Sequence, residues 1–190
     1  MKYKNLHKII FEYEQKVFVL LFAVFFIGFL AGSLSVFNNT SYIEISEPVL
    51  HKLYFCSILA FCAFLIILFT LGFTSFGLPF IIFINLFSGL FLSVIGCSIT
   101  VSYGYVGCIV YSLFMLPLFL VIVLSLLYIS YSSIRLSGAL FNVFKSGTRF
   151  ISPCEYLLPH IFKFIFFFLS TLIISIIYNY IFIPLFLKIL

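Results

Sequence analysis

Long uncharged apolar runs alternate with short polar segments along the chain. A helix that crosses the hydrocarbon core of a membrane needs about 20 apolar residues, and five runs of the sequence reach that length. The pattern predicts an all-α protein, a polytopic membrane helical bundle of about five transmembrane helices in a single membrane domain, residues 1–190. The expected spans are residues 17–37, 53–72, 78–101, 106–129 and 164–187.

The uncharged stretch of residues 53–134 is ambiguous, because it can hold three spans of ordinary length or four short ones. Basic residues decide between them. Residues 1–16 and 130–163 together carry eight of the ten Lys and Arg residues, so the positive-inside rule places both segments in the cytosol. Segments on the same side are separated by an even number of crossings, which three central spans satisfy. The N-terminus is then inside and the C-terminus outside.

The basic N-terminal segment also suits a signal peptide. The apolar run that follows has 21 residues, however, more than the usual 7 to 15 of a cleaved segment. We therefore expect a retained first helix. Apolar residues at helical spacing before it predict a cytosolic amphipathic segment, residues 1–16, at the membrane interface; they are Leu6, Ile9, Ile10, Tyr13 and Val17.

Residues 130–163 form the longest predicted cytosolic segment and the one with room for a partner-facing element. A short helix is expected there, with Leu136 and Leu140 on one face, ending near Ser146. The sequence Ser152-Pro153-Cys154-Glu155 then reads as a capping box that starts the last helix. A kink is expected at Pro159.

Composition supports a membrane protein and excludes several function classes. Hydrophobic residues make up 65% of the chain and charged residues 8%, against about 25% charged in a soluble domain. The net charge of +5 does not indicate nucleic-acid binding, because no folded soluble surface gathers the basic residues. The five cysteines have no metal-ligand spacing, so they predict packing residues and no metal or cofactor.

Candidate catalytic residues are sparse. His7, His51 and His160 all fall at the edges of predicted spans, so an intramembrane Ser–His protease would lack its base. Residues 86–89 match only half of a Gly-x-Ser-Gly motif, and no HExxH motif or paired intramembrane carboxylate occurs. The chain is therefore expected not to be an enzyme.

Small residues are the richer signal. Gly28 and Gly32 form a GxxxG motif in the first span, and small residues let membrane helices approach closely. They can pack helices within this chain or dock a partner's transmembrane helix, and both remain open. The third span carries further small residues along its length, Ser88, Gly89, Ser93 and Gly96.

Two intramembrane amides and one turn complete the candidate residues. Asn85 and Asn179 are expected to bond between helices, with a substrate path as the alternative. Gly77 and Pro79 suit a tight turn between the second and third spans, since glycine tolerates unusual backbone angles and proline starts helices.

Several of these motifs together resemble a known family. They are the GxxxG within residues 26–32, Gly77-Leu78-Pro79 followed by an apolar run to Gly89, Leu116-Pro117, and the closing Tyr180-Ile181-Phe182-Ile183-Pro184. With the length and the five-span layout, they make the chain similar to the stage II sporulation protein M family of endospore-forming bacteria over nearly its whole length. It departs from the family at Ser88, where a Lys is expected, and at Tyr178, near which relatives often carry a Glu.

The resemblance implies a protein of the mother-cell membrane at the sporulation septum, required for engulfment. It implies a non-enzymatic scaffold that contacts membrane lipid and positions sporulation proteins D and P, which cut septal peptidoglycan. A different class remains as the alternative: a substrate-binding or permease subunit of a membrane transporter, including a relative with no role in sporulation.

Overall fold

The computed structural model describes residues 2–38, 47–146, 154–177 and 180, and almost all of them are helical. The helices are α1 (Lys2–Asn38), α2 (Glu47–Leu71), α3 (Gly77–Val110), α4 (Leu116–Ser146) and α5 (Cys154–Ile177), with a π-helical turn, η1 (Tyr111–Met115), before α4. No β-strand occurs in the described part of the chain. The predicted all-α helical bundle is confirmed.

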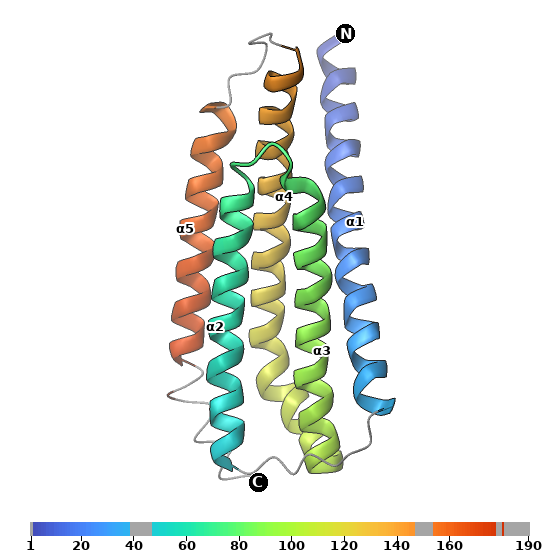
Figure 1. Ribbon diagram of the computed structural model, residues 1–190, viewed down its shortest axis with the longest axis vertical. Helices are drawn as coiled ribbons and strands as arrows, with labels where there is room; N and C mark the ends of the chain where they lie inside the picture. The colour runs from blue at the N-terminus through green and yellow to red at the C-terminus, as the bar shows by residue number, and fades with distance from the viewer. Residues whose placement is uncertain (1, 39–46, 147–153, 178–179, 181–190) are drawn as a thin grey trace.

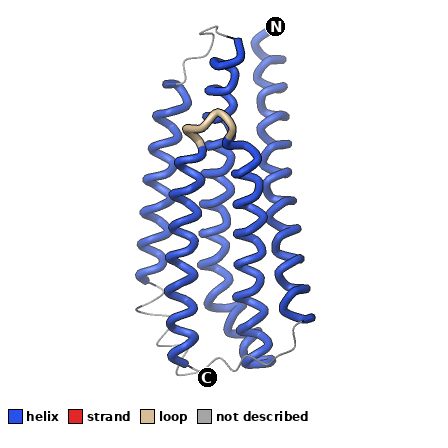
Figure 2. The backbone as a smooth tube through the Cα atoms, viewed as in Figure 1, coloured by secondary structure: helices blue, strands red, loops and turns tan. Residues whose placement is uncertain are grey.

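The five long helices lie side by side and alternate in direction (Figure 1). A loop of residues 72–76 joins α2 to α3, toward the end of the bundle where α1 begins (Figure 2). α1 begins and α5 ends at opposite ends of the bundle. This arrangement is the one that alternating membrane crossings produce.

The central helix of the bundle is α4. Leu118, Ile122 and Leu126 lie on it and are at most 1% exposed. The rings of Phe119 and Tyr128 extend from α4 toward α2 and α1 and pack against Phe61 and Phe18, respectively. Leu120 and Leu124 of the same helix are about half exposed, so one face of α4 lies on the outside of the bundle. The face that packs against protein can hold more polar side chains than a lipid-facing one.

Gly104 reverses the chain inside the segment Gly77–Val110. Its φ of 59° and ψ of −138° lie in a region that only glycine adopts readily. After it the chain folds back along the preceding helix. Gly107 lies close to the carbonyl oxygen of Ile99, and the ring of Tyr111 lies close to Gly96. The turn expected between residues 101 and 106 therefore lies at Gly104.

The π-helical turn η1 lies directly before Leu116 and Pro117. A proline has no N–H for the preceding helical turn, and its ring clashes with the carbonyl four residues earlier. Single π-helical turns occur inside α-helices at places where the helix kinks. The helical path therefore continues through η1 into α4 instead of ending at Pro117.

Within the described ranges, four helical segments are long and apolar enough to cross a membrane, namely Gln15–Asn38, Gly77–Ile109, Leu116–Asn142 and Leu157–Ile177. The expected second span, residues 53–72, falls on α2. The apolar segment described there, Cys56–Leu71, is shorter than the other four. Many large apolar side chains on the outside of the bundle are exposed. The chain is a multi-pass membrane protein.

The predicted cytosolic segment, residues 130–163, differs most from the structure. The helix expected to end at residue 129 continues to Ser146. Ser130, Ser133 and Ser137 are at most 2% exposed, so this half of α4 belongs to the bundle core. The hydropathy pattern placed the end of the fourth span too early. Serine lowers the mean hydropathy of a segment even where its hydroxyl is buried and bonded to another helix.

The two ends of the chain also differ from expectation. α1 is one continuous helix from Lys2, so the segment of residues 1–16 is not a separate helix, and the side chains of residues 1–14 lie outside the described part. α5 begins at Cys154, and its apolar segment begins at Leu157, before the predicted start at residue 164. The end of the predicted span, residue 187, lies outside the described residues. Ser152 and Pro153 of the predicted capping box lie outside the described residues.

Candidate functional site

The GxxxG motif of α1 packs against α3. A β-carbon at Gly28 would overlap the carbonyl oxygen of Leu86, and one at Gly32 would come within 2.6 Å of the carbonyl oxygen of Leu90. Gly89 of α3 is equally restricted, because a β-carbon there would overlap the carbonyl oxygen of Phe25. The two helices thus meet backbone to backbone, the kind of contact that small residues allow in membranes.

The other small residues of the third span also face protein. Ser93 lies beside Gly32, since a β-carbon at Gly32 would be 3.0 Å from that of Ser93. Ser88 is fully buried and its hydroxyl donates to the carbonyl of Asn85 at 2.9 Å. At Gly96 a β-carbon would be 2.7 Å from the ring of Tyr111. The structure therefore places these small residues in contacts within the chain.

Gly77 and Pro79 lie at the start of α3, after the loop of residues 72–76. A β-carbon at Gly77 would overlap the carbonyl oxygen of Leu71, and the Gly77 N–H donates to the Thr74 carbonyl at 3.3 Å. Pro79 is exposed in the first turn of α3, where a backbone N–H has no helical partner to lose. Both residues serve the turn.

Asn85 joins α3 to α4 in the core. Its Nδ2 donates to the carbonyl of Ile81 at 2.8 Å and to the hydroxyl oxygen of Ser130 at 2.7 Å. Because a carbonyl can only accept, the bond to Ile81 assigns the amide orientation. Oδ1 is then buried without a partner among the described residues. The other amide, Asn179, lies outside the described part.

Serines of α4 bond to backbone carbonyls near the end of α2. The Ser133 hydroxyl donates to the carbonyl of Leu68 at 2.7 Å, and the Ser137 hydroxyl donates to that of Thr74 at 2.7 Å. Carbonyl groups in the last turn of a helix have no N–H partner within the helix, so they are free to accept a bond from another residue. These bonds attach the end of α2 and the loop after it to the half of α4 that the sequence assigned to a cytosolic segment.

His160 joins three helices. Its Nδ1 lies 2.9 Å from the Ser132 hydroxyl of α4, and its Nε2 lies 3.3 Å from the Phe69 carbonyl of α2. The ring stacks on Phe69 at 5.0 Å. Since the carbonyl can only accept, Nε2 carries the proton in this contact and a neutral Nδ1 accepts from Ser132.

His160 lies near the start of the apolar segment, close to the span edge where the sequence placed it, but it contacts a serine that the sequence did not pair with it. The residue is 1% exposed and lies within Leu157–Ile177. Sequence spacing did not reveal the pairing with Ser132, because the two residues lie on different helices. The signal available was the Ser-rich stretch of residues 130–137, which is unusual beside an apolar span.

Ser132 and His160 have the residue types of a nucleophile and its base, but their surroundings favour packing. Ser132 is 6% exposed and lies in the middle of a continuous helix. Backbone N–H groups there are used by the helix, so they cannot form an oxyanion hole beside the hydroxyl. The described residues also contain no group of three or more His, Cys, Asp or Glu placed to hold a metal ion.

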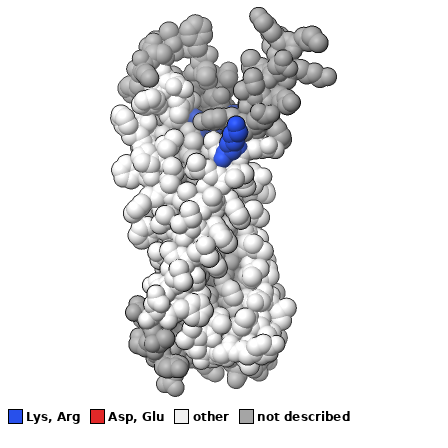
Figure 3. All heavy atoms as spheres, turned by 90° about the vertical axis from the view of Figure 1, so that its right-hand side faces the viewer, with Lys and Arg blue, Asp and Glu red and all other residues white. Residues whose placement is uncertain are grey.

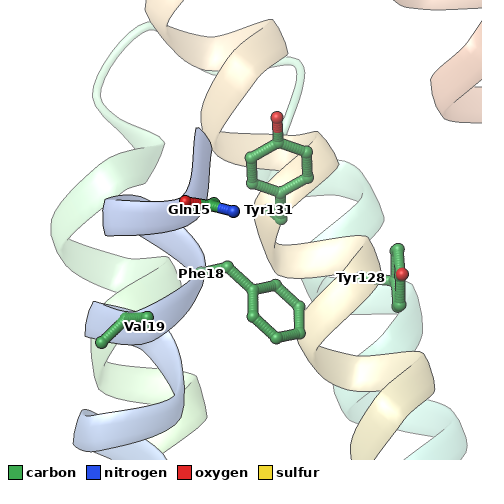
Figure 4. Close-up of a pocket in the computed structure, with 5 residues that line it drawn as sticks. All are labelled: Gln15, Phe18, Val19, Tyr128 and Tyr131. Carbon is green, nitrogen blue, oxygen red and sulfur yellow. The ribbon is translucent and has the colours of Figure 1, made fainter. Parts of the chain in front are cut away.

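An open groove of about 410 Å³ runs between α1 and α4. Figure 4 shows Phe18 pointing from α1 into the space between the two helices, with Gln15 one turn away and Tyr131 facing it from α4. Tyr128 bridges toward α5, with its ring 5.4 Å from Phe167. The groove is lined by Gln15, Phe18, Val19, Tyr128 and Tyr131.

Basic side chains lie near the same groove. The guanidinium carbon of Arg135 lies 5.7 Å from the centre of the Tyr131 ring, and the Lys163 ammonium lies 5.9 Å from it. Both distances fall within the range of cation–π attraction. Figure 3 shows the basic side chains on this face of the molecule near one end of the bundle.

Comparison with known protein families, curated proteins and solved structures found no match. The resemblance to the stage II sporulation protein M family therefore rests on the sequence motifs and stays a prediction.

Proposed function

We propose that this chain is a non-enzymatic membrane scaffold that holds partner proteins in place in the bilayer. The observation that supports the proposal is that polar side chains inside the bundle bond to other helices. Ser132, Ser133 and His160 bond one helix to another, rather than facing an open space where a substrate would react. Such bonds make a rigid platform out of helices that lipid alone would not hold together.

The resemblance supplies the identity of the partners. The partners would be the sporulation proteins D and P, and the site of action the mother-cell membrane at the septum during engulfment. In this proposal the chain crosses the membrane five times, with the N-terminus in the cytosol. The described basic residues support that orientation, since they gather toward one end of the bundle. Arg135 and Lys163 lie near the ring of Tyr131, and Tyr131 lines a groove with Gln15, the neighbour of Lys16.

The contact between α1 and α3 restricts where a partner helix binds. Gly28 and Gly32 are buried against α3, so a partner does not reach the GxxxG face without displacing that helix. The partner contacts of the scaffold therefore lie on other surfaces of the bundle.

Deletion of the gene in its sporulating host tests the proposal. Imaging of a membrane dye should show septa that form but fail to engulf the forespore, and a wild-type copy of the gene should restore engulfment. Tagged protein solubilised in detergent should also retain proteins D and P. Normal engulfment in the deletion strain would reject the scaffold role in sporulation.

One observation favours the alternative, a transport subunit. The Asn85 Oδ1 is a buried acceptor without a partner among the described residues, and a group of this kind is expected on a substrate path. Under this reading the purified protein retains a specific small polar ligand, and replacement of Asn85 abolishes retention. A scaffold shows no such ligand.

A further inference from the structure

The loop between α2 and α3 presents aromatic side chains on the outside of the bundle. Phe76, its last residue, is 74% exposed, and Phe73 is 42% exposed. The ring of Phe76 meets that of Phe141 on α4 edge to face, with 6.1 Å between the ring centres, and Phe141 is also exposed. Figure 2 shows the loop in tan, at the end of the bundle where α1 begins and α4 ends. Phe73, Phe76 and Phe141 are called the loop aromatics below.

The loop aromatics continue the exposed apolar surface of α3. Phe80, Phe83 and Phe87 follow Phe76 at helical spacing, so they lie on one face of α3. All three are exposed, and the rings of Phe83 and Phe87 are 4.9 Å apart. On a membrane protein a surface of this kind lies against lipid chains, which are as apolar as the side chains. The lipid-facing surface is therefore continuous from the middle of α3 to the loop.

A hydrogen bond between the loop and α4 fixes the depth of the loop. The Ser137 hydroxyl donates to the carbonyl of Thr74 at 2.7 Å. The apolar segment of α4 runs past Ser137 to Asn142, which adds about 7 Å of helix. The headgroup region on each side of a bilayer is roughly 5–8 Å thick. With Asn142 at the water, the loop lies where the headgroups meet the acyl chains.

The backbone of the loop is bonded in the way that a lipid environment requires. The N–H groups of Gly72, Phe73 and Thr74 donate to carbonyl groups at the end of α2. The Thr74 hydroxyl also turns inward and donates to the Leu71 carbonyl at 2.8 Å. Backbone groups that bond within the protein do not need water, whereas an unsatisfied group in a bilayer costs several kcal/mol. The loop can therefore leave water at little cost.

Basic side chains indicate a second level at which the membrane surface could lie. Arg135 and Lys163 lie 5.7 and 5.9 Å from the centre of the Tyr131 ring, and Tyr131 is further from the end of α4 than Ser137 is. A surface at that level would put the loop aromatics in water, where an exposed apolar patch marks a protein contact. The bonded backbone and the continuity with α3 favour the lipid level. Basic residues are compatible with it, because their long stems can lie along apolar surface.

We propose that the loop aromatics insert into the bilayer at the boundary between headgroups and acyl chains. The loop thus binds the lipid surface and is not available to a soluble partner. Apolar and aromatic side chains bury by ~5–10 Å at this boundary, which agrees with the depth set by Ser137. Soluble partners would then meet the ends of α1 and α4, which extend past the loop (Figure 1). The proposal does not depend on the scaffold function.

Tryptophan fluorescence tests the depth of the loop. The chain contains no tryptophan, so Phe76→Trp supplies a single reporter. The purified full chain is reconstituted in phosphatidylcholine vesicles, and two quenchers are compared. Phosphatidylcholine brominated near the carbonyl end of its acyl chains acts from within the bilayer, and acrylamide acts from the water.

Two references give the range of the measurement. Phe83→Trp, on the exposed face further along α3, gives the acrylamide quenching of a side chain in lipid. Free N-acetyltryptophanamide in the same buffer gives that of a ring in water. Acrylamide should quench Phe76→Trp about as weakly as Phe83→Trp, and the brominated lipid should quench Phe76→Trp strongly.

The opposite pattern would overturn the proposal. Acrylamide quenching equal to that of N-acetyltryptophanamide, with no quenching by the brominated lipid, would place the loop aromatics in water and leave them to a soluble partner. Phe141→Trp repeats the measurement from α4, beside Phe76, and should give the same result. Size-exclusion chromatography identifies a misfolded variant, and in that event the other reporter decides.

Discussion

The Cα atom of Gly28 in α1 faces the backbone carbonyl oxygen of Leu86 in α3 with no room for a β-carbon between them. The relationship is reciprocal, because Gly89 of α3 faces the carbonyl oxygen of Phe25 in the same way. A backbone atom cannot move aside as the tip of a flexible side chain can. The attachment of α1 to the bundle therefore depends on glycine at these positions.

Replacement of Gly28 by Ile should destabilise the bundle. Overpacking of a tight contact costs ~1–3 kcal/mol and occasionally more. We expect the upper part of this range because the atoms that obstruct a side chain at position 28 belong to the backbone of Leu86. The measurement is the free energy of unfolding in mixed detergent micelles, followed by circular dichroism. Ala31→Ile, at an exposed position of the same helix, is the control and should change stability by less than ~0.5 kcal/mol. Unchanged stability of Gly28→Ile, with loss of a co-purified partner, would instead assign this face to partner binding.

His160 should stabilise the contact between α5, α4 and α2 through its ring and its hydrogen bonds. His160→Phe keeps an aromatic ring against Phe69 but loses the bond to Ser132, so it should cost about 0.6 to 1.7 kcal/mol, the range for hydrogen bonds between membrane helices. His160→Ala also removes the ring and should cost roughly 3 kcal/mol. A double-mutant cycle of His160→Phe with Ser132→Ala measures the bond itself. Additive effects in that cycle would show that the hydroxyl and the imidazole do not interact.

Asn85 should be replaceable by Leu with little loss of stability. The change removes the bond to Ser130, but it also removes a buried acceptor without a partner, whose burial costs about 1–3 kcal/mol. We expect the free energy of unfolding of Asn85→Leu to lie within ~1 kcal/mol of wild type. If this variant folds normally and yet loses engulfment or ligand retention, Asn85 has a functional contact that the bundle does not need. A large loss of stability would mean that the Ser130 bond outweighs the desolvated Oδ1.

The direction of the helices can be tested with reporter fusions in a bacterial host. Alkaline phosphatase becomes active only outside the cytosol, where its disulfides form. A fusion after Leu190 should be active and a fusion after Ser146 inactive, with green fluorescent protein giving the reverse pattern. Activity after Ser146 would contradict the cytosolic placement of the basic end. Two active fusions would mean that α5 does not cross the membrane.

The membrane class and the number of helices follow from the sequence alone. A run of about 20 apolar residues has one physical solution in a bilayer, because backbone polar groups must bond within the helix. The reversal near Gly104 and the start of α3 at Gly77 were also predictable, since turns between apolar runs depend on local residues. The end of α4 was not, because the Ser133 and Ser137 hydroxyls bond to carbonyls of α2 and of the loop after it, which lie far away in sequence.

The sequence by itself determined that Gly28, Gly32 and Gly89 make close helix contacts, since glycines at such spacing in lipid have little other use. It did not determine whether those contacts lie within the chain or with a partner. Only the tertiary structure placed α1 against α3, joined His160 to Ser132, and brought Arg135 and Lys163 to the ring of Tyr131. The physical reason is that local pattern sets the helices, whereas which faces meet depends on the packing of all five together.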